Sequence, residues 1–93
     1  MIVLYAEIEC LIYHAQSIKE KRSVIKPLLL KIRRDYNVSI AEVEYQDLWQ
    51  RTKFSIVTIS NEMQHAEKVI DDVIKAIEMS GNIEITSTFK ERI

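Results

Sequence analysis

Alternating apolar and polar residues near the start of the chain predict a β-strand over residues 2–13. Every second residue in this segment is apolar: Ile2, Leu4, Ala6, Ile8, Cys10 and Ile12. The intervening positions are mixed and include Glu7 and Glu9. A two-residue period of this kind is typical of a strand with one face in a core and the other partly in water.

Three later segments also have the pattern of strands, namely residues 38–45, 54–60 and 83–89. In the first of them the alternation changes parity, which predicts a β-bulge near Ile40 and Ala41. Residues 54–60 carry apolar side chains on both parities, and this is typical of a central strand covered on both faces. Apolar and polar residues alternate over most of residues 83–89, which suits an edge strand.

A first helix is predicted over residues 18–36, where apolar residues recur at helical spacing. Ser17 and Glu20 have the spacing of a capping box, in which side chains satisfy free N–H groups at the start of a helix. Pro27 removes the hydrogen bond to the carbonyl of Ser23, because proline has no N–H. We therefore expect one helix with a kink near Ser23, and two shorter helices are the alternative.

A second amphipathic helix is predicted after Asn61, which with Gln64 provides a second cap signal. Its apolar stripe consists of Met63, Ala66, Val69, Ile70, Val73, Ile74 and Ile77. Gly81 is the only glycine of the chain, and it suits the left-handed residue that often ends a helix.

The order β-α-β-β-α-β predicts an α+β fold, a ferredoxin-like sandwich, in a single domain over residues 1–93. Right-handed crossovers place the first and third strands in the centre of a four-stranded antiparallel sheet, with both helices on one face. The other face is open and carries Tyr5, Leu11 and Tyr13. In this topology the start of the first helix, the loop between the second and third strands, and the turn at Gly81 share one end of the molecule.

The net charge and the cysteine content limit the binding partners and the cellular compartment that we expect. A net charge of −1 argues against a general attraction to nucleic acid or membrane, but a local patch remains open. The single cysteine, Cys10, allows no intramolecular disulfide and suits a reducing cytoplasm. No stretch is long enough to cross a bilayer, and the first residues lack the basic leader of a signal peptide. We expect a cytoplasmic protein without a membrane partner.

Two segments at the shared end resemble the signatures of a known family. Residues 17–22, Ser-Ile-Lys-Glu-Lys-Arg, resemble the Ser-Leu-Lys-x-Lys-Arg signature of the YlxP-like family of small bacterial proteins. Residues 41–51, Ala-Glu-Val-Glu-Tyr-Gln-Asp-Leu-Trp-Gln-Arg, resemble its second signature. The resemblance covers essentially the whole chain, and Pro27 departs from the helix expected in the family.

The resemblance implies a ferredoxin-like fold and little about activity, because the family is uncharacterised. Genes of the family tend to lie beside those for translation initiation factor 2 and ribosome-binding factor A. This association implies a setting near ribosomes or RNA, without a mechanism.

Basic residues gather at the start of the first helix, where free N–H groups and the helix dipole already favour an anion. The cations expected at this end are Lys19, Lys21, Arg22, Lys26, Arg51 and Lys53. Together they could hold phosphate groups. The simpler interpretation is a solvated surface on which Asp47 or Glu44 pairs with Arg22 or Arg51.

The predicted hairpin loop, residues 46–51, carries more apolar surface than is usual for such a loop. It consists of Gln46, Asp47, Leu48, Trp49, Gln50 and Arg51. A lone hairpin tryptophan more often packs over the end of the core, and stacking on a base is the alternative for Trp49. Gln46 and Gln50 either bind a ligand or close the loop.

Patterns for catalysis or metal binding are weak. A single glycine excludes a glycine-rich phosphate loop. His14 and His65 fall near opposite ends of the expected fold, and Cys10 is expected to point inward, where a thiol is usually inert. We therefore expect no enzymatic activity, no catalytic residue, no cofactor and no metal site.

Two main functions remain as hypotheses, and a weaker third is an enzyme that acts on a phosphorylated small molecule at the same end. The first is a non-enzymatic accessory factor that contacts structured RNA or the ribosome through Lys19, Lys21, Arg22, Trp49, Gln50 and Arg51. The alternative is a protein-interaction module, a homodimer that uses the open sheet face or an edge strand. Base stacking on the open face is not expected, because Glu7 and Glu9 would repel phosphate.

Overall fold

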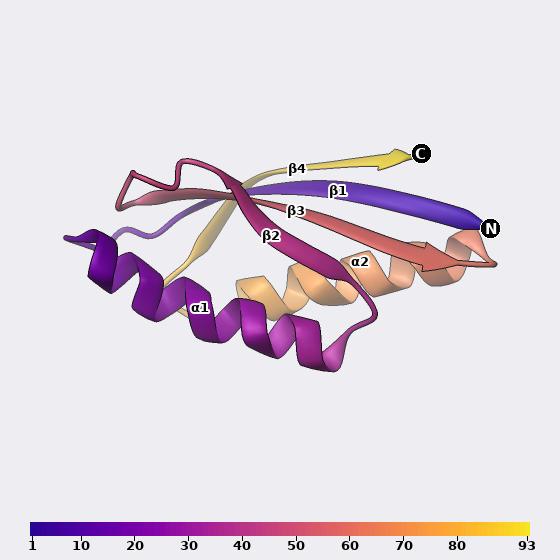
Figure 1. Ribbon diagram of the computed structural model, residues 1–93, viewed down its shortest axis with the longest axis horizontal. Coiled ribbons are helices and arrows are strands. Elements are labelled where there is room, and N and C mark those ends of the chain that lie inside the picture. Colours follow the sequence, from indigo (N-terminus) through magenta and orange to yellow (C-terminus); the bar gives the residue numbers. More distant parts are fainter.

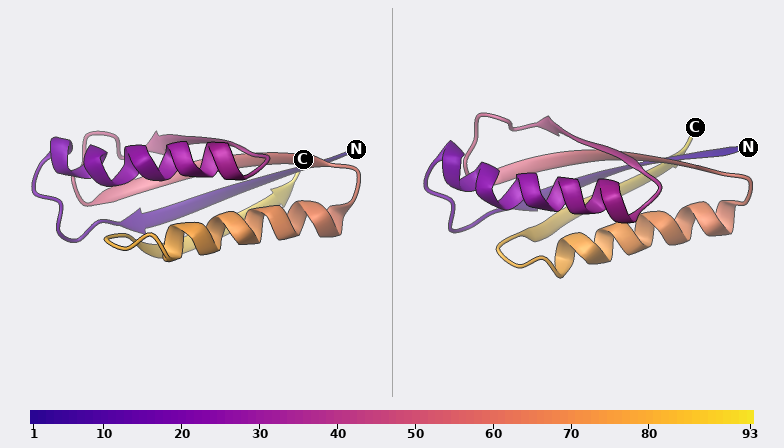
Figure 2. Two further views of the ribbon diagram at one scale, coloured as in Figure 1. Left: turned by 90° about the horizontal axis from the view of Figure 1, so that it is seen from below. Right: turned by 60° about the horizontal axis from the view of Figure 1, so that its bottom comes forward.

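The computed structural model describes residues 1–93 and contains four strands and two helices. In chain order the elements are β1 (Ile2–Leu11), α1 (Ile18–Asp35), β2 (Ser39–Glu44), β3 (Arg51–Ser60), α2 (Met63–Glu78) and β4 (Glu84–Arg92). The strands form one antiparallel sheet in the order β2-β3-β1-β4. Both helices lie on one side of this sheet (Figure 1; Figure 2). The predicted ferredoxin-like topology is therefore confirmed.

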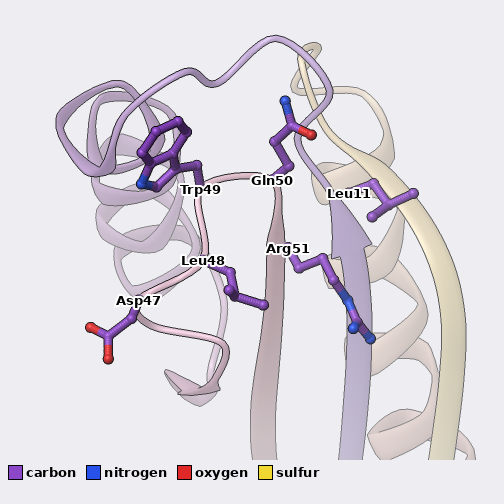
Figure 3. A pocket seen from close by; sticks show the side chains of 6 residues that line it. All are labelled: Leu11, Asp47, Leu48, Trp49, Gln50 and Arg51. Atoms are coloured by element: carbon purple, nitrogen blue, oxygen red, sulfur yellow. The ribbon is translucent and has the colours of Figure 1, made fainter.

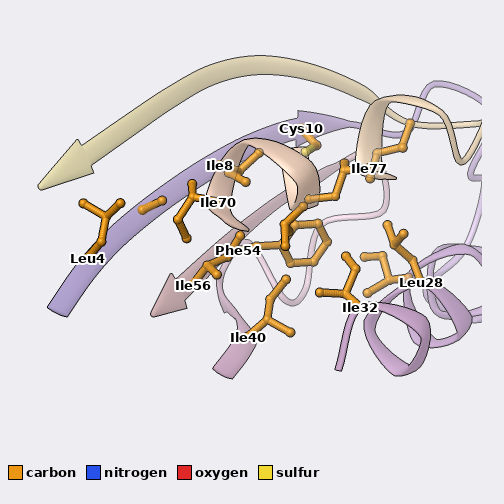
Figure 4. Close-up of a cluster of buried hydrophobic side chains, with 14 of the residues drawn as sticks. Leu4, Ile8, Cys10, Leu28, Ile32, Ile40, Phe54, Ile56, Ile70 and Ile77 are labelled. Carbon is orange, nitrogen blue, oxygen red and sulfur yellow. The ribbon is translucent and has the colours of Figure 1, made fainter. Parts of the chain in front are cut away.

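The core lies between the sheet and the helices, and it is built by the alternation seen in the sequence. Strictly alternating positions of β1 are buried, and their neighbours are half-buried. α1 and α2 each add a stripe at helical spacing, with Ile32 and Ile70 fully buried (Figure 4). These side chains meet Phe54 and Ile56 of β3 in a single cluster. Periodic sequence patterns thus bring distant segments into one layer, because each element has one apolar face to bury.

α1 is one continuous helix although Pro27 lies inside it, so the alternative of two shorter helices is wrong. Its start is capped as predicted, since Ser17 Oγ accepts the N–H of Glu20 at 3.0 Å. The carboxylate of Glu20 in turn accepts the N–H of Gln16 at 2.8 Å. The exposed side of the helix carries the proline ring, which keeps it out of the core.

The β-bulge lies further along β2 than the sequence predicts. Ile40 and Ala41 pair regularly with β3, and the register shifts between Glu42 and Glu44. Just before the shift, an ion pair places the carboxylate of Glu42 2.8 Å from Nζ of Lys21 and favours an inward position for this side chain. Glu42 therefore keeps its inward position, and the extra residue falls after it.

The start of α2 differs from the sequence prediction, and the turn after its end agrees with it in part. Asn61 does not cap this helix, because the N-cap is Glu62, whose side chain makes no capping hydrogen bond. At the other end α2 stops at Glu78 with Met79 as a right-handed C-cap, so Gly81 does not itself end the helix. Gly81 is nevertheless left-handed, with a φ of 76°, in the turn that follows, and Asn82 has a φ of 62°. Neither α1 nor α2 is long and apolar enough to cross a membrane.

Candidate functional site

The start of α1 and the 46–51 loop are neighbours, as the topology predicts. Gln50 Nε2 donates to the carbonyls of Tyr13 at 3.0 Å and Ala15 at 3.1 Å. The carbonyl of Gln50 accepts the N–H of Ile12 at 2.9 Å. The turn after α2 lies at this end too. Gln50 therefore closes the loop against the β1–α1 connection, which is one of the two roles expected for it.

Lys21 is buried, with only 1% of its surface exposed, although the sequence suggests an exposed contact residue. Its Nζ lies 2.8 Å from Oε2 of Glu42 and donates to the carbonyl of Tyr45 at 2.6 Å. Thr52 Oγ1 donates to the same carboxylate at 2.6 Å. Lys21 thus supports the base of the loop and is not accessible to a ligand.

The position of Lys21 on the helix carried a signal for this burial. It lies four residues before Ile25 and eleven before Ile32, so it falls on the buried stripe of α1. A cation on such a stripe requires a buried acceptor nearby. The basic run around it in the sequence concealed this requirement.

The cations of β3 are also paired with carboxylates. Arg51 lies 2.9 Å from Glu9, and its guanidinium stacks 4.0 Å from the centre of the Tyr45 ring. Lys53 Nζ lies 2.7 Å from Glu7 and 3.3 Å from Glu44. The partner of Arg51 is therefore Glu9, and Glu44 pairs with Lys53, so neither makes the pairing expected from the sequence.

These pairs shift the pKa values of the groups involved. The ammonium of Lys53, with the hydroxyl of Tyr5, lowers the pKa of Glu7 below its ordinary value. The hydroxyl of Tyr45 and then the guanidinium of Arg51 lower the pKa of Glu9. Both carboxylates are held in the charged form, which suits a structural role better than proton transfer.

Lys19 and Arg22 are exposed and have no carboxylate partner, whereas Lys21 is buried and both Lys21 and Arg51 are paired with carboxylates. Trp49 keeps 51% of its surface exposed. The more common arrangement, in which a hairpin tryptophan packs over the core, is therefore not the one found. Three of the predicted contact residues remain available to a ligand.

A shallow hollow of about 620 Å³ surrounds the loop and is lined by Leu11, Asp47, Leu48, Trp49, Gln50 and Arg51. In Figure 3 the side chain of Leu48 points toward β3, whereas Trp49 and Asp47 point away from Leu11 and Arg51. The indole of Trp49 lies on the α1 side of the loop with half of its surface exposed, and the apolar lining of the hollow comes from Leu11, Leu48 and Trp49.

A second hollow, the α1–β2 groove, lies between α1 and the edge of the sheet and has a volume of about 310 Å³. Its α1 side carries Arg22, Lys26 and Arg33. Sequence analysis missed this groove as a unit. The spacing of these cations, four and then seven residues, was the available signal, because it places them on one face of a helix.

Residues 3–89 match the family described as "Protein of unknown function (DUF503)". The chain belongs to this family. It is 45% identical over 87 residues to the "Uncharacterized protein YlxP" of Bacillus subtilis (strain 168), a match that covers 94% of this chain and 95% of that protein. The predicted resemblance to YlxP-like proteins is thereby confirmed.

Solved structures similar to this DUF503 chain share its fold. The de novo designed protein Foldit4 has a TM-score of 0.60 and 15% identity, over 96% of each chain. The de novo designed protein LFR1 1 with ferredoxin fold has a TM-score of 0.55 and 14% identity, over 100% of this chain and 84% of that one. Identities this low show the fold alone. In the DUF503 chain no three His, Cys, Asp or Glu side chains are grouped closely enough to hold a metal ion.

Proposed function

We propose that this DUF503 protein is a non-enzymatic accessory factor that contacts structured RNA, with the ribosome as its setting. The observation that carries the proposal is the exposed indole of Trp49, at the same end as unpaired cations of α1. An aromatic ring offers a stacking surface to an unpaired base, and neighbouring cations attract the phosphates beside it.

The residues at this end divide into two groups. Lys19, Arg22 and Trp49 are presented to solvent and would contact the RNA. Lys21 and Gln50 fix the loop relative to α1, so they position the contact residues without touching the ligand. The ribosomal setting rests on the association of YlxP-like genes with those of translation factors.

The proposal is tested by co-sedimentation with ribosomal particles from cell lysate across a salt series. The test variant is Lys19→Glu/Arg22→Glu, and the matched control is Lys75→Glu/Arg92→Glu. The control cations are also exposed and without an ion pair, so both variants change the net charge equally. We expect the test variant to lower the salt slope by about 2, because each lost phosphate contact lowers it by about 1.

Trp49→Ala probes the stacking contact separately. It is expected to weaken binding about tenfold without changing the salt slope, because stacking involves no counterion release. Failure of the wild type to travel with any ribosomal particle at low salt would overturn the proposal. Equal loss of binding in the control variant would show that only overall charge matters.

A homodimer through the open sheet face is the second candidate, because large apolar side chains remain exposed there. Ile59 and Phe89 keep 55% and 49% of their surface exposed, and they lie opposite Val3 and Glu7 of β1 on this face. Sedimentation equilibrium measures whether the protein is a monomer or a dimer. A dimer that dissociates in an Ile59→Lys/Phe89→Lys variant supports this candidate, and a wild-type monomer at high concentration rejects it.

A further inference from the structure

The face of α1 that lines the α1–β2 groove combines apolar and basic residues. It contributes Arg22, Ile25, Lys26, Leu29, Leu30 and Arg33, whose spacing of three and four residues makes one continuous strip. Leu30 keeps 57% of its surface exposed, although it lies on a helix that packs against the core. An aliphatic side chain left uncovered inside a groove offers a contact for an apolar partner group.

The groove runs along a free edge of the sheet, because β2 pairs only with β3. The N–H of Ile12 bonds to the carbonyl of Gln50, and in antiparallel pairing such bonds recur at every second residue. The core-facing residues of β3 therefore direct their backbone groups toward β1. Ile40 and Glu42 lie opposite core-facing residues of β3, whose backbone groups are directed toward β1. The N–H and C=O groups of Ile40 and Glu42 therefore point outward from β2.

The groove is positively charged. Arg22, Lys26 and Arg33 have no carboxylate partner. The carboxylate of Glu42 also lines the groove, but it is neutralised by Lys21 at 2.8 Å. An occupant with negative charge would therefore complement the groove.

We propose that the α1–β2 groove binds an extended acidic segment of a partner protein, which adds to the sheet as a fifth strand beside β2. Its backbone pairs with the outward groups of Ile40 and Glu42, as in other cases of strand addition. Its aliphatic side chains pack on Leu30, and its carboxylates meet Lys26 and Arg33. A free strand edge with an apolar strip matches a peptide, whereas a phosphate backbone would use neither.

Arg33 protects this edge while the groove is empty. Its guanidinium donates to the carbonyl of Ile40 at 2.7 Å. An added strand replaces this bond with a backbone N–H and releases the guanidinium for a carboxylate of the peptide. The same side chain thus blocks unspecific pairing and selects for an acidic partner.

The first test is a selection of twelve-residue peptides from a random displayed library on the full chain. The enriched peptides are expected to carry Asp or Glu together with Leu, Ile or Val at alternate positions. Lys26→Glu/Leu30→Lys should weaken their binding about tenfold or more, since both a charge and an apolar contact are lost. The matched control is Lys75→Glu/Met79→Lys, which likewise replaces a lysine by glutamate and an exposed apolar residue by lysine, but around the end of α2, and should leave binding unchanged.

Backbone pairing is tested with the best selected peptide, N-methylated at alternate residues in two registers. One register should bind about tenfold more weakly and the other normally, because only one set of N–H groups faces β2. The amide signals of Ile40 and Glu42 should shift on binding. Equal binding in both registers, or undiminished binding by the groove variant, overturns the proposal.

This proposal and the RNA contact can fail separately. Trp49 lies outside the groove, so the Trp49→Ala variant should still bind the peptide but should bind RNA more weakly. The Lys26→Glu/Leu30→Lys variant should still bind RNA but should bind the peptide more weakly. If no peptide is selected and Lys26→Glu/Leu30→Lys no longer travels with ribosomal particles, the groove belongs to the RNA surface and the peptide proposal is overturned.

Discussion

Lys21 shows that a charged residue can belong to the core when its partners are fixed. Removing the ammonium would leave the largely buried carboxylate of Glu42 with Thr52 as its remaining donor. The carbonyl of Tyr45 would lose one of its two hydrogen bonds and keep the one from the N–H of Leu48 at 3.0 Å. The side chain therefore links the start of α1 to the end of β2, and the shape of the site depends on it.

Lys21→Met is expected to lower the free energy of unfolding by about 3 kcal/mol, because it breaks a buried ion pair from one side. Urea denaturation measures this change. Lys68→Met serves as the control, since Lys68 makes an exposed pair with Asp72 on α2 and its loss should cost less than about 1 kcal/mol. Equal effects of the two substitutions would contradict the structural role assigned to Lys21.

Cys10 is expected to be unreactive in the folded protein. Burial, and then the negative charge of Glu9, raise the pKa of its thiol to about 12. A thiol reagent at pH 8 should therefore label Cys10 only slowly in the native protein and completely in denaturant, because the thiolate is the reactive form. Native labelling at the rate of a free thiol would show that the strand opens or that the thiol is accessible.

At the scale of the element, α1 forms as one helix because its buried stripe outweighs the unfavourable proline. Pro27 leaves the carbonyl of Ser23 without its helical N–H partner. Ile25, Leu28 and Ile32 anchor the helix on both sides of that position. Tertiary packing thus overrides a local preference in this helix.

Pro27→Ala should raise the free energy of unfolding by about 2 kcal/mol. The substitution restores a hydrogen bond and helix propensity, and the greater freedom of the unfolded chain offsets part of the gain. Thermal or urea unfolding measures this change in the free energy of unfolding, with Lys31→Ala as an exposed control on the same helix. A loss of stability would mean that the proline is needed for the packing of α1.

At the scale of the whole molecule, ion pairs on the open face connect three strands. Glu9 and Arg51 join β1 to β3, and Lys53 joins Glu7 of β1 to Glu44 of β2. The same charges make the face polar at its centre. They also hold the register between strands whose partners are far apart in the sequence.

These pairs predict a loss of stability in acid. The pKa values of Glu7 and Glu9 are lowered in the folded state from an ordinary value of 4.5. The contribution of the charged carboxylates to the free energy of unfolding is therefore complete above pH 4.5, and it is lost as the pH falls through the lowered pKa values of the folded state. Unfolding measured between pH 7 and pH 2 should show this decline, and it should be flatter in Glu7→Gln/Glu9→Gln. An unchanged profile in the variant would assign acid sensitivity to other groups.

The sequence by itself determined the element order, the topology and the family of this protein. Two-residue and helical periods report which face of each element is buried, and the right-handed crossover rule then leaves one arrangement. That arrangement also placed the start of α1 beside the 46–51 loop. The exposure of Lys19 and Arg22 could be predicted as well, because they lie off the buried stripe of α1.

Only the tertiary structure decided which charges are paired and which side chains are presented. Arg51 meets Glu9 across 42 residues of sequence, so the pair depends on the register between β1 and β3. The burial of Lys21, the exposure of Trp49 and the α1–β2 groove likewise depend on how separate elements pack. Local patterns specify the elements, whereas partners and surfaces arise only when those elements are assembled.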